Sequence, residues 1–116
     1  MTQDCIFCRI IRGELSTEFV YQDDRVVAFR DIAPKAPVHI LIVPRRHIPS
    51  LAHVTSDDEG VLGHMMVVAR QVAEQEGVLE SGFRTIINTG PDGGQEIYHI
   101  HMHLLGGRPL GRMVAR

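Results

Sequence analysis

The chain has 116 residues, the size of one ordinary domain, and its 44% hydrophobic and 22% charged residues are typical of a globular protein. Its 12 basic and 14 acidic side chains give a formal net charge of −2, whereas general nucleic-acid binders usually carry a basic excess. No apolar stretch is long enough to span a membrane, and residues 1–8 lack the pattern of a secretory signal. We therefore expect one domain, residues 1–116, in a cytoplasmic enzyme or binding protein with no nucleic-acid or membrane partner.

The first third of the chain predicts short elements. Residues 6–12 predict a short helix that ends at Gly13. Residues 18–22 and 25–30 are rich in β-formers and predict a hairpin, and residues 38–43 predict a strand bounded by prolines.

One long amphipathic helix is predicted next. Ser56 and Glu59 have the spacing of a capping box. Apolar residues then recur at helical spacing over residues 61–73, and Gly77 is expected to end the helix.

The remaining elements predict the fold class. Residues 83–88 and 96–105 predict two more strands, with the glycine-rich loop 88–94 between them. Because most strands follow one another without an intervening helix, we expect an α+β fold. Its five-stranded, mainly antiparallel sheet would have one long and one short helix on one face.

The most informative motif is the alternating run His99, His101 and His103. Because alternate residues of a strand face opposite sides, these imidazoles are expected to share one face. An exposed edge strand would have polar residues of this kind, but Glu, Lys or Thr would serve equally well. The side chains expected to pack on the long helix from the other face are Tyr98, Ile100, Met102 and Leu104.

Two kinds of chemistry use clustered histidines. Three imidazoles can hold a catalytic zinc ion. Alternatively, one neutral imidazole can act as a nucleophile, while its neighbours bind a phosphoryl or nucleotidyl group. In that case the loop 88–94 would present backbone N–H groups to phosphate oxygens. These residues alone leave both interpretations open.

The two cysteines, Cys5 and Cys8, have the spacing C-x-x-C. This spacing fits half of a zinc site, a redox pair or two buried thiols. A Cys₂His₂ site would need two histidines from elsewhere in the chain.

The run of residues 99–105 resembles the histidine-triad (HIT) motif, in which three histidines alternate with apolar residues and two apolar residues follow. Further segments resemble the Hint branch of this family in the same order along the chain, and the last two resemble its bacterial members. These segments are residues 4–11, 28–32, 37–44, 88, 93–95, 96–99 and 104–110.

The resemblance implies a purine nucleoside phosphoramidase, which hydrolyses the P–N bond of adenosine or guanosine 5′-phosphoramidates. It implies that His101 attacks phosphorus and forms a covalent nucleotidyl-histidine. His103 would bind the phosphoryl oxygens and His39 would support it. The backbone carbonyl of His99 would fix the tautomer of His101.

The resemblance also implies a nucleotide site. Asp31 would accept hydrogen bonds from the ribose hydroxyls. The phosphate and the leaving group would lie beside Asn88, Gly94, Gln95 and Glu96. Many eukaryotic members have Ser at the position of Glu96, which leaves the leaving-group preference open. The apolar slot for the base would be formed by Ile6, Phe7, Phe29 and Ile32, with Ile10 beside them.

Two larger features follow from the resemblance. Two subunits would form a homodimer with a continuous ten-stranded sheet. In members with paired N-terminal cysteines, a structural zinc ion is bound by four residues that correspond here to Cys5, Cys8, His47 and His99. Such a site would attach the first helix to the histidine strand and leave His101 free, and no organic cofactor is expected.

Two alternatives to a phosphoramidase stay open on the sequence. One is a nucleotide-binding regulator that docks partner proteins, which would keep its role in a His101→Ala variant. The other is a zinc-dependent hydrolase that uses His39, His101 and His103, which would lose all turnover with a chelator.

Overall fold

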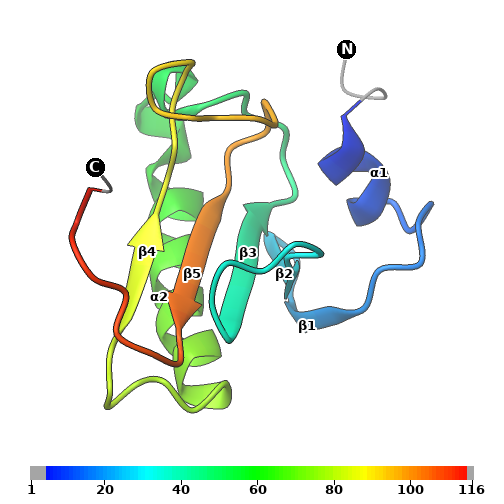
Figure 1. Ribbon diagram of the computed structural model, residues 1–116. Helices are drawn as coiled ribbons and strands as arrows, with labels where there is room; N and C mark the ends of the chain where they lie inside the picture. Colours follow the sequence, from blue (N-terminus) through cyan, green and yellow to red (C-terminus); the bar gives the residue numbers. More distant parts are fainter. Residues whose placement is uncertain (1–4, 115–116) are drawn as a thin grey trace.

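Within residues 5–114, the part of the chain that the structure describes, five strands form one sheet that is accompanied by two α-helices. The computed structural model is shown in Figure 1. Two single-turn 3-10 helices, Leu51–His53 and Ser56–Asp58, precede the long helix. The main elements are α1 (Ile6–Ile11), β1 (Phe19–Gln22), β2 (Val26–Arg30), β3 (Val38–Pro44), α2 (Glu59–Gln75), β4 (Phe83–Ile86) and β5 (Met102–Gly106).

The strands lie in the spatial order β1-β2-β3-β5-β4, and each neighbouring pair is antiparallel. The last strand in sequence, β5, therefore lies between β3 and β4. Its register places His103 opposite Leu41 and Leu105 opposite His39. The predicted α+β fold with a five-stranded antiparallel sheet is confirmed, and this pairing brings histidines from distant parts of the sequence side by side.

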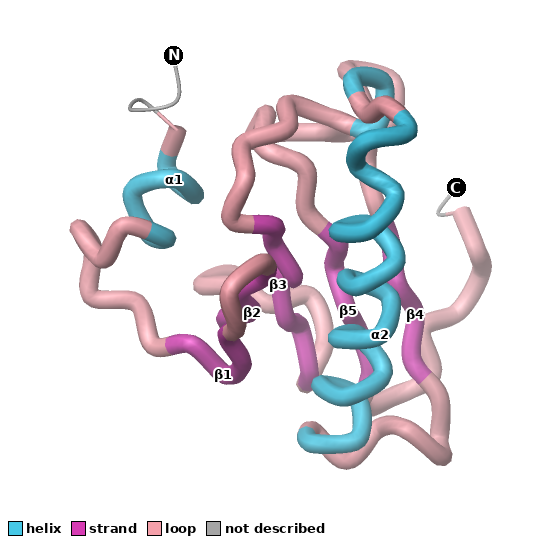
Figure 2. The backbone as a smooth tube through the Cα atoms, turned by 180° about the vertical axis from the view of Figure 1, so that it is seen from behind, coloured by secondary structure: helices cyan, strands magenta, loops and turns pink. Residues whose placement is uncertain are grey.

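The central strands are buried on both faces, and the expectation that both helices cover one face is wrong. Ile40 and Ile42 of β3 pack in a core with α2, whereas Leu41 and Val43, which alternate with them, pack with α1. Figure 2 shows α2 running along the sheet, with α1 set apart from it. A strand that is apolar at every position needs cover on both sides. Residues 40–43 are all apolar, so the sequence already indicated that this strand is covered on both faces.

The long helix α2 has the predicted apolar stripe, but the turn that leads into it is capped at a different residue. Met65, Val68 and Ala69 of its apolar stripe are buried against the sheet. The capping box is one residue earlier than predicted, because Thr55 and Asp58 form it within the 3-10 turn before α2. Gly77 follows the helix with a φ of 77°, as a C-terminal glycine does. No helix in the described part of the chain is long and apolar enough to cross a membrane.

The histidine strand is shorter than predicted. β5 begins at Met102, so residues 96–101 lie outside the ladder. This segment is bonded to the chain after β3 instead, because the N–H of Ile100 donates to the carbonyl of Ile48 at 2.7 Å. Met102 and Leu104 pack with α2 as predicted, but Tyr98 is 45% exposed and does not join that core. This departure from the ladder lets His99 and His101 turn toward different partners.

Candidate active site and metal centre

Three of the predicted histidines meet on the face of the sheet that α1 covers in part. His39 on β3 and His103 on β5 have ring centroids 5.1 Å apart, and His101 lies 5.1 Å from His103. The ring of Phe7 in α1 meets His101 edge-on at 5.0 Å. The pairing of β3 with β5 therefore brings His39 beside His103, and His101 joins them from the residue just before β5.

The tautomer of His101 follows from one hydrogen bond. Its Nδ1 lies 2.8 Å from the carbonyl oxygen of His99, which can only accept. In the neutral ring the proton is therefore on Nδ1, and the lone pair is on Nε2. His101 is buried, and an uncharged imidazole with a free Nε2 is the form that can attack an electrophile.

A second series of hydrogen bonds sets the tautomers of His39 and His103. The backbone N–H of Lys35 donates to Nδ1 of His39 at 3.0 Å, so the neutral His39 carries its proton on Nε2. That nitrogen lies 2.9 Å from Nδ1 of His103 and donates to it. His103 therefore carries its own proton on Nε2. The cluster thus combines a lone pair on His101 with an N–H donor on His103.

The protonation states agree with these tautomers. Burial, together with the neighbouring His101 and His39, lowers the pKa of His103 to about 4. Burial also lowers the pKa of His39, which the carboxylate of Asp31 opposes. Both rings are therefore neutral near pH 7.

Asp31 borders the histidine cluster. Its Oδ1 accepts from the backbone N–H of Ala33 at 2.8 Å. Its Oδ2 lies 3.4 Å from Nε2 of His39. The side chain keeps a fifth of its surface exposed, so Asp31 is less deeply buried than His39.

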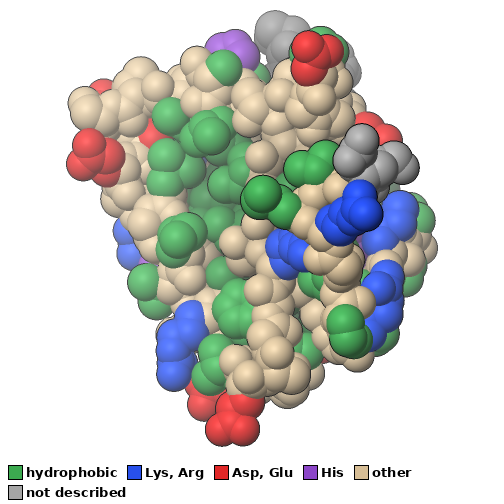
Figure 3. Space-filling model, turned by 60° about the vertical axis from the view of Figure 1, so that its left-hand side comes forward, with side chains coloured by type: hydrophobic (Ala, Val, Ile, Leu, Met, Phe, Trp, Pro, Cys, Tyr) green, Lys and Arg blue, Asp and Glu red, His purple; other side chains and the backbone are tan. Residues whose placement is uncertain are grey.

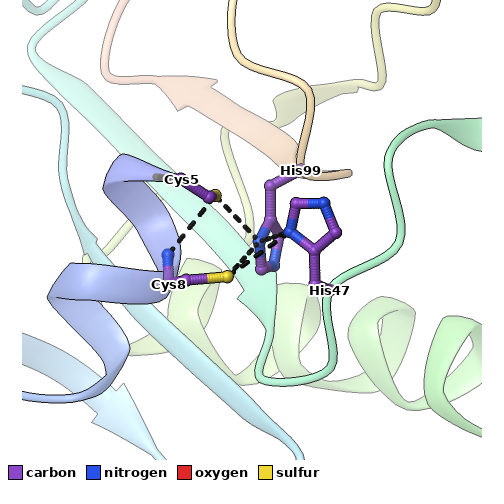
Figure 4. Close-up of side chains that lie close together, drawn as sticks. All are labelled: Cys5, Cys8, His47 and His99. Carbon is purple, nitrogen blue, oxygen red and sulfur yellow. Dashed lines mark hydrogen bonds between the residues drawn. The ribbon is translucent and has the colours of Figure 1, made fainter. Parts of the chain in front are cut away.

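The four residues predicted to bind zinc also meet (Figure 4). The Cys5 and Cys8 sulfurs lie 3.4 and 3.6 Å from Nδ1 of His99. Nδ1 of His47 lies 3.4 Å from the Cys8 sulfur and 3.2 Å from Nδ1 of His99. A tetrahedral zinc site has edges of about 3.6 Å between sulfur and nitrogen and about 3.3 Å between nitrogens. The spacing fits such a site.

The chemistry of the donors also fits a cation. His99 Nε2 lies 2.8 Å from the carbonyl of Pro44 and donates to it, so the lone pair on Nδ1 points into the cluster. Metal-bound histidines are commonly held in this way. Burial, with Cys5 nearby, raises the pKa of Cys8 to about 11. A bound cation would favour the thiolate instead.

A second group, Asp31, His39 and His103, is also compact enough to hold a metal ion. Here the proton positions disfavour it. Nδ1 of His39 accepts from Lys35, so Nε2, the atom that faces the group, carries a proton and has no lone pair for a metal. His39 is linked to His103 by a hydrogen bond in which His39 donates. This arrangement disfavours a zinc ion held by His39, His101 and His103.

The predicted base slot is only partly assembled. Phe7 and Phe29 are buried in edge-to-face contact at 5.6 Å, and Ile10 packs in the same core. Ile6 is 39% exposed, and Ile32 is fully exposed. The structure therefore buries the two phenylalanines and leaves the two isoleucines at the surface.

The residues predicted beside the phosphate differ in their surroundings. Gln95 is buried, and each polar atom of its amide has a partner, because it accepts from the N–H of Gly90 and donates to the carbonyls of Pro49 and Ile97. Its side chain therefore holds the loop in shape. Asn88 is half-buried close to Gly94, and Glu96 is exposed.

Sequence reasoning missed the backbone N–H of Lys35. It named Gln95 as a neighbour of the phosphate and missed that the amide of this residue bonds within its own surroundings. No side-chain pattern identifies a backbone donor. The Gln95 amide depends on carbonyls that only the folded chain brings near.

The buried, neutral His103 predicts an effect of pH on stability. Because its pKa is about 4 in the fold and about 6.5 in an unfolded chain, the unfolded state takes up a proton between these values. The free energy of unfolding should therefore fall as the pH is lowered from about 6.5 to about 4. Urea unfolding at several pH values should show a shallower fall for His103→Gln. Equal slopes for both proteins would contradict this.

Comparison with known proteins agrees with the motif. Residues 12–110 match the family model of the HIT domain. The purine nucleoside phosphoramidase of Escherichia coli K12 is 57% identical over 115 residues, which cover 99% of this chain and 97% of that protein. A solved HIT family hydrolase from Legionella pneumophila is 45% identical, with a TM-score of 0.90 over 92% of this chain and 96% of that chain. One from Clostridium thermocellum is 41% identical, with a TM-score of 0.94 over 97% and 98%. The chain therefore belongs to the HIT family.

Proposed function

We propose that this protein is a purine nucleoside phosphoramidase that works through a nucleotidyl-histidine. The observation that carries the proposal is the pair of complementary nitrogens, a lone pair on Nε2 of His101 and an N–H on Nε2 of His103. The similarity to the E. coli phosphoramidase over nearly the whole chain supports the same activity. A cytoplasmic location remains a prediction.

The reaction has two steps in this proposal. Nε2 of His101 forms a bond to phosphorus while the P–N bond breaks, and the leaving amine takes up a proton from solvent water. The ring becomes positively charged, and the carbonyl of His99, which accepts from Nδ1, stabilises that charge. The oxygen of a water molecule then bonds to phosphorus while the new N–P bond breaks, and its proton returns to solvent. This releases the nucleoside monophosphate and restores neutral His101. The N–H of His103 stabilises a phosphoryl oxygen throughout.

The nucleoside would bind beside this centre. Oδ2 of Asp31, which accepts no backbone hydrogen bond among the described residues, is a suitable acceptor for ribose hydroxyls. The base would lie on the exposed Ile6 and Ile32, above Phe7 and Phe29. Asn88 and the backbone of residues 94–96 would lie near the phosphate, and the exposed carboxylate of Glu96 would influence which amines are accepted.

The covalent intermediate is directly testable. Protein quenched during turnover of adenosine 5′-phosphoramidate should carry an added AMP on the peptide with residues 99–103. The His101→Ala variant should carry none and should lose turnover by roughly a thousandfold or more, because it lacks the nucleophile. The variant His53→Gln is a matched control, since His53 is an exposed histidine that bonds Ser50 away from the cluster. Full turnover by His101→Ala would refute the mechanism.

We also propose that Cys5, Cys8, His47 and His99 hold a structural zinc ion. Zinc favours tetrahedral sulfur and nitrogen ligands, and the four donor atoms lie within 4.8 Å of one another. The site would join α1 to the segments on either side of it, one after β3 and one before β5. It would give folding energy, and no step of the reaction would pass through it.

The zinc proposal predicts one ion per chain by elemental analysis. Cys8→Ser should lose the ion and show a lower Tm, because a ligand is removed and α1 loses its attachment. The control variant His53→Gln should keep the bound ion and the wild-type Tm. After chelation, turnover should fall only in proportion to the unfolded fraction, whereas a zinc-dependent hydrolase would lose all activity. Metal content unchanged in Cys8→Ser would contradict the assigned ligands.

We propose further that two copies pair through β4, which continues the sheet to ten strands. β4 is one of the two edge strands of the sheet. Exposed apolar side chains occur there and on α2, since Met66 is 62%, Val67 55% and Ile86 36% exposed. Figure 3 shows hydrophobic side chains gathered over the side that carries β4 in Figure 1. Unpaired strand edges and apolar patches of this kind favour association.

The proposed interface is testable in solution. Val67→Glu should convert a dimer into a monomer in sedimentation experiments, because it places a charge in an apolar contact. Gln22→Glu on β1, the opposite edge of the sheet, should leave the dimer intact. A wild-type protein that sediments as a monomer, or the reverse response of the two variants, would contradict pairing through β4.

A further inference from the structure

The loop between β2 and β3, residues 31–37, is folded around His39. The N–H of Asp31 donates to the carbonyl of His39 at 3.0 Å, and the N–H of Lys35 donates to its Nδ1 at 3.0 Å. Arg108 holds the loop from the other side, because its guanidinium donates to the carbonyl of Lys35 at 2.9 Å. The residue proposed to bind ribose and the histidine behind the phosphate donor thus belong to one hydrogen-bonded unit.

The proton on Nε2 of His39 has two acceptors close by. Nδ1 of His103 lies 2.9 Å away in a hydrogen bond, and Oδ2 of Asp31 lies 3.4 Å away in an electrostatic contact. The other charged or titratable groups that influence these rings are Lys35 and His101. A carboxylate at this distance attracts the proton and so weakens the bond to His103.

The two oxygens of Asp31 are not equivalent. Oδ1 is engaged by the N–H of Ala33, so the side chain is oriented by its own turn. Oδ2 lies 3.4 Å from Nε2 of His39 and, unlike Oδ1, accepts no backbone hydrogen bond among the described residues, so it is the oxygen that we expect a ligand to engage. A ribose hydroxyl that donates to Oδ2 would partly compensate the negative charge of the Asp31 carboxylate. The carboxylate would then attract the proton of His39 less strongly.

We propose that Asp31 is a positioning residue that couples occupancy of the ribose site to the phosphate donor, through His39 and His103. When ribose binds, the His39 proton is donated more fully to Nδ1 of His103. Because hydrogen bonds in a series polarise one another, the N–H on Nε2 of His103 then becomes a stronger donor to the phosphoryl oxygen. The proposal rests on the proposed function and extends it, since it makes the nucleoside increase the rate of chemistry as well as the affinity.

The first test uses the protein without substrate. Histidine-selective ¹⁵N NMR at pH 7 should show that Asp31→Asn shifts the ring nitrogens of His39, which the carboxylate contacts at 3.4 Å, and those of His103, which lies within 4.8 Å of it. A direct effect of the charge on His103 would persist in a His39→Gln background, whereas the coupling through His39 would be lost there. Asn keeps the oxygen that accepts from Ala33 and removes the charge. Asp24→Asn is the matched control, because Asp24 is an exposed aspartate on the hairpin turn. His103 signals that respond equally to both variants, or to neither, would overturn the coupling.

The second test separates rate from affinity. The rate constant for nucleotidylation of His101 is measured at saturating adenosine 5′-phosphoramidate and at saturating 2′,3′-dideoxy analogue. The wild type should react about threefold to tenfold more slowly with the analogue, the value of one hydrogen bond, and Asp31→Asn should react at similar rates with both. If ribose only adds affinity, the wild-type rates at saturation are equal and the proposal is overturned. If the wild type forms no nucleotidyl-histidine, the phosphoramidase proposal fails and the NMR result alone decides the coupling.

Discussion

The hydrogen bond from His101 to the carbonyl of His99 connects the two centres of this molecule. Through its side chain His99 belongs to the cluster with Cys5 and Cys8, and through its backbone it sets the tautomer of His101. The ring of Phe7, which lies between the two cysteines in sequence, contacts both histidines edge-on. Any displacement of His99 would therefore move the nitrogen on which the proposed chemistry depends.

The two clusters contain similar side chains and differ in where their protons lie. His99 donates from Nε2 to Pro44 and turns a lone pair toward the cysteines. His39 accepts at Nδ1 from a backbone N–H and turns a proton toward its neighbours. The first arrangement suits a cation, and the second suits the binding of a phosphoryl oxygen. Backbone groups on neighbouring segments thus decide the chemistry of each imidazole.

The sheet makes this arrangement possible because it is covered on both faces. On one side Ile40 and Ile42 pack with α2 and give the strands a rigid base. On the other side α1 covers only part of the sheet, and the histidines lie beside it. Burial there excludes water enough to keep His103 neutral, while Asp31 stays accessible. The same burial that stabilises the fold therefore prepares the rings for reaction.

Local features of the chain were predictable from the sequence, because they depend on spacing and on residue type. The motif from His99 to His103 and the apolar period of α2 were recognisable before the fold was known. The four residues of the metal cluster followed only from the family resemblance, since the spacing of Cys5 and Cys8 alone left three interpretations open. The start of β5 at Met102, the capping box at Thr55 and the cover of both faces were not, since each depends on competition between segments far apart in the chain. The family resemblance implied that the carbonyl of His99 fixes the tautomer of His101. Only the tertiary structure decided the proton positions of His39 and His99, because the groups that set them are backbone atoms of Lys35 and Pro44, which carry no signature in the sequence.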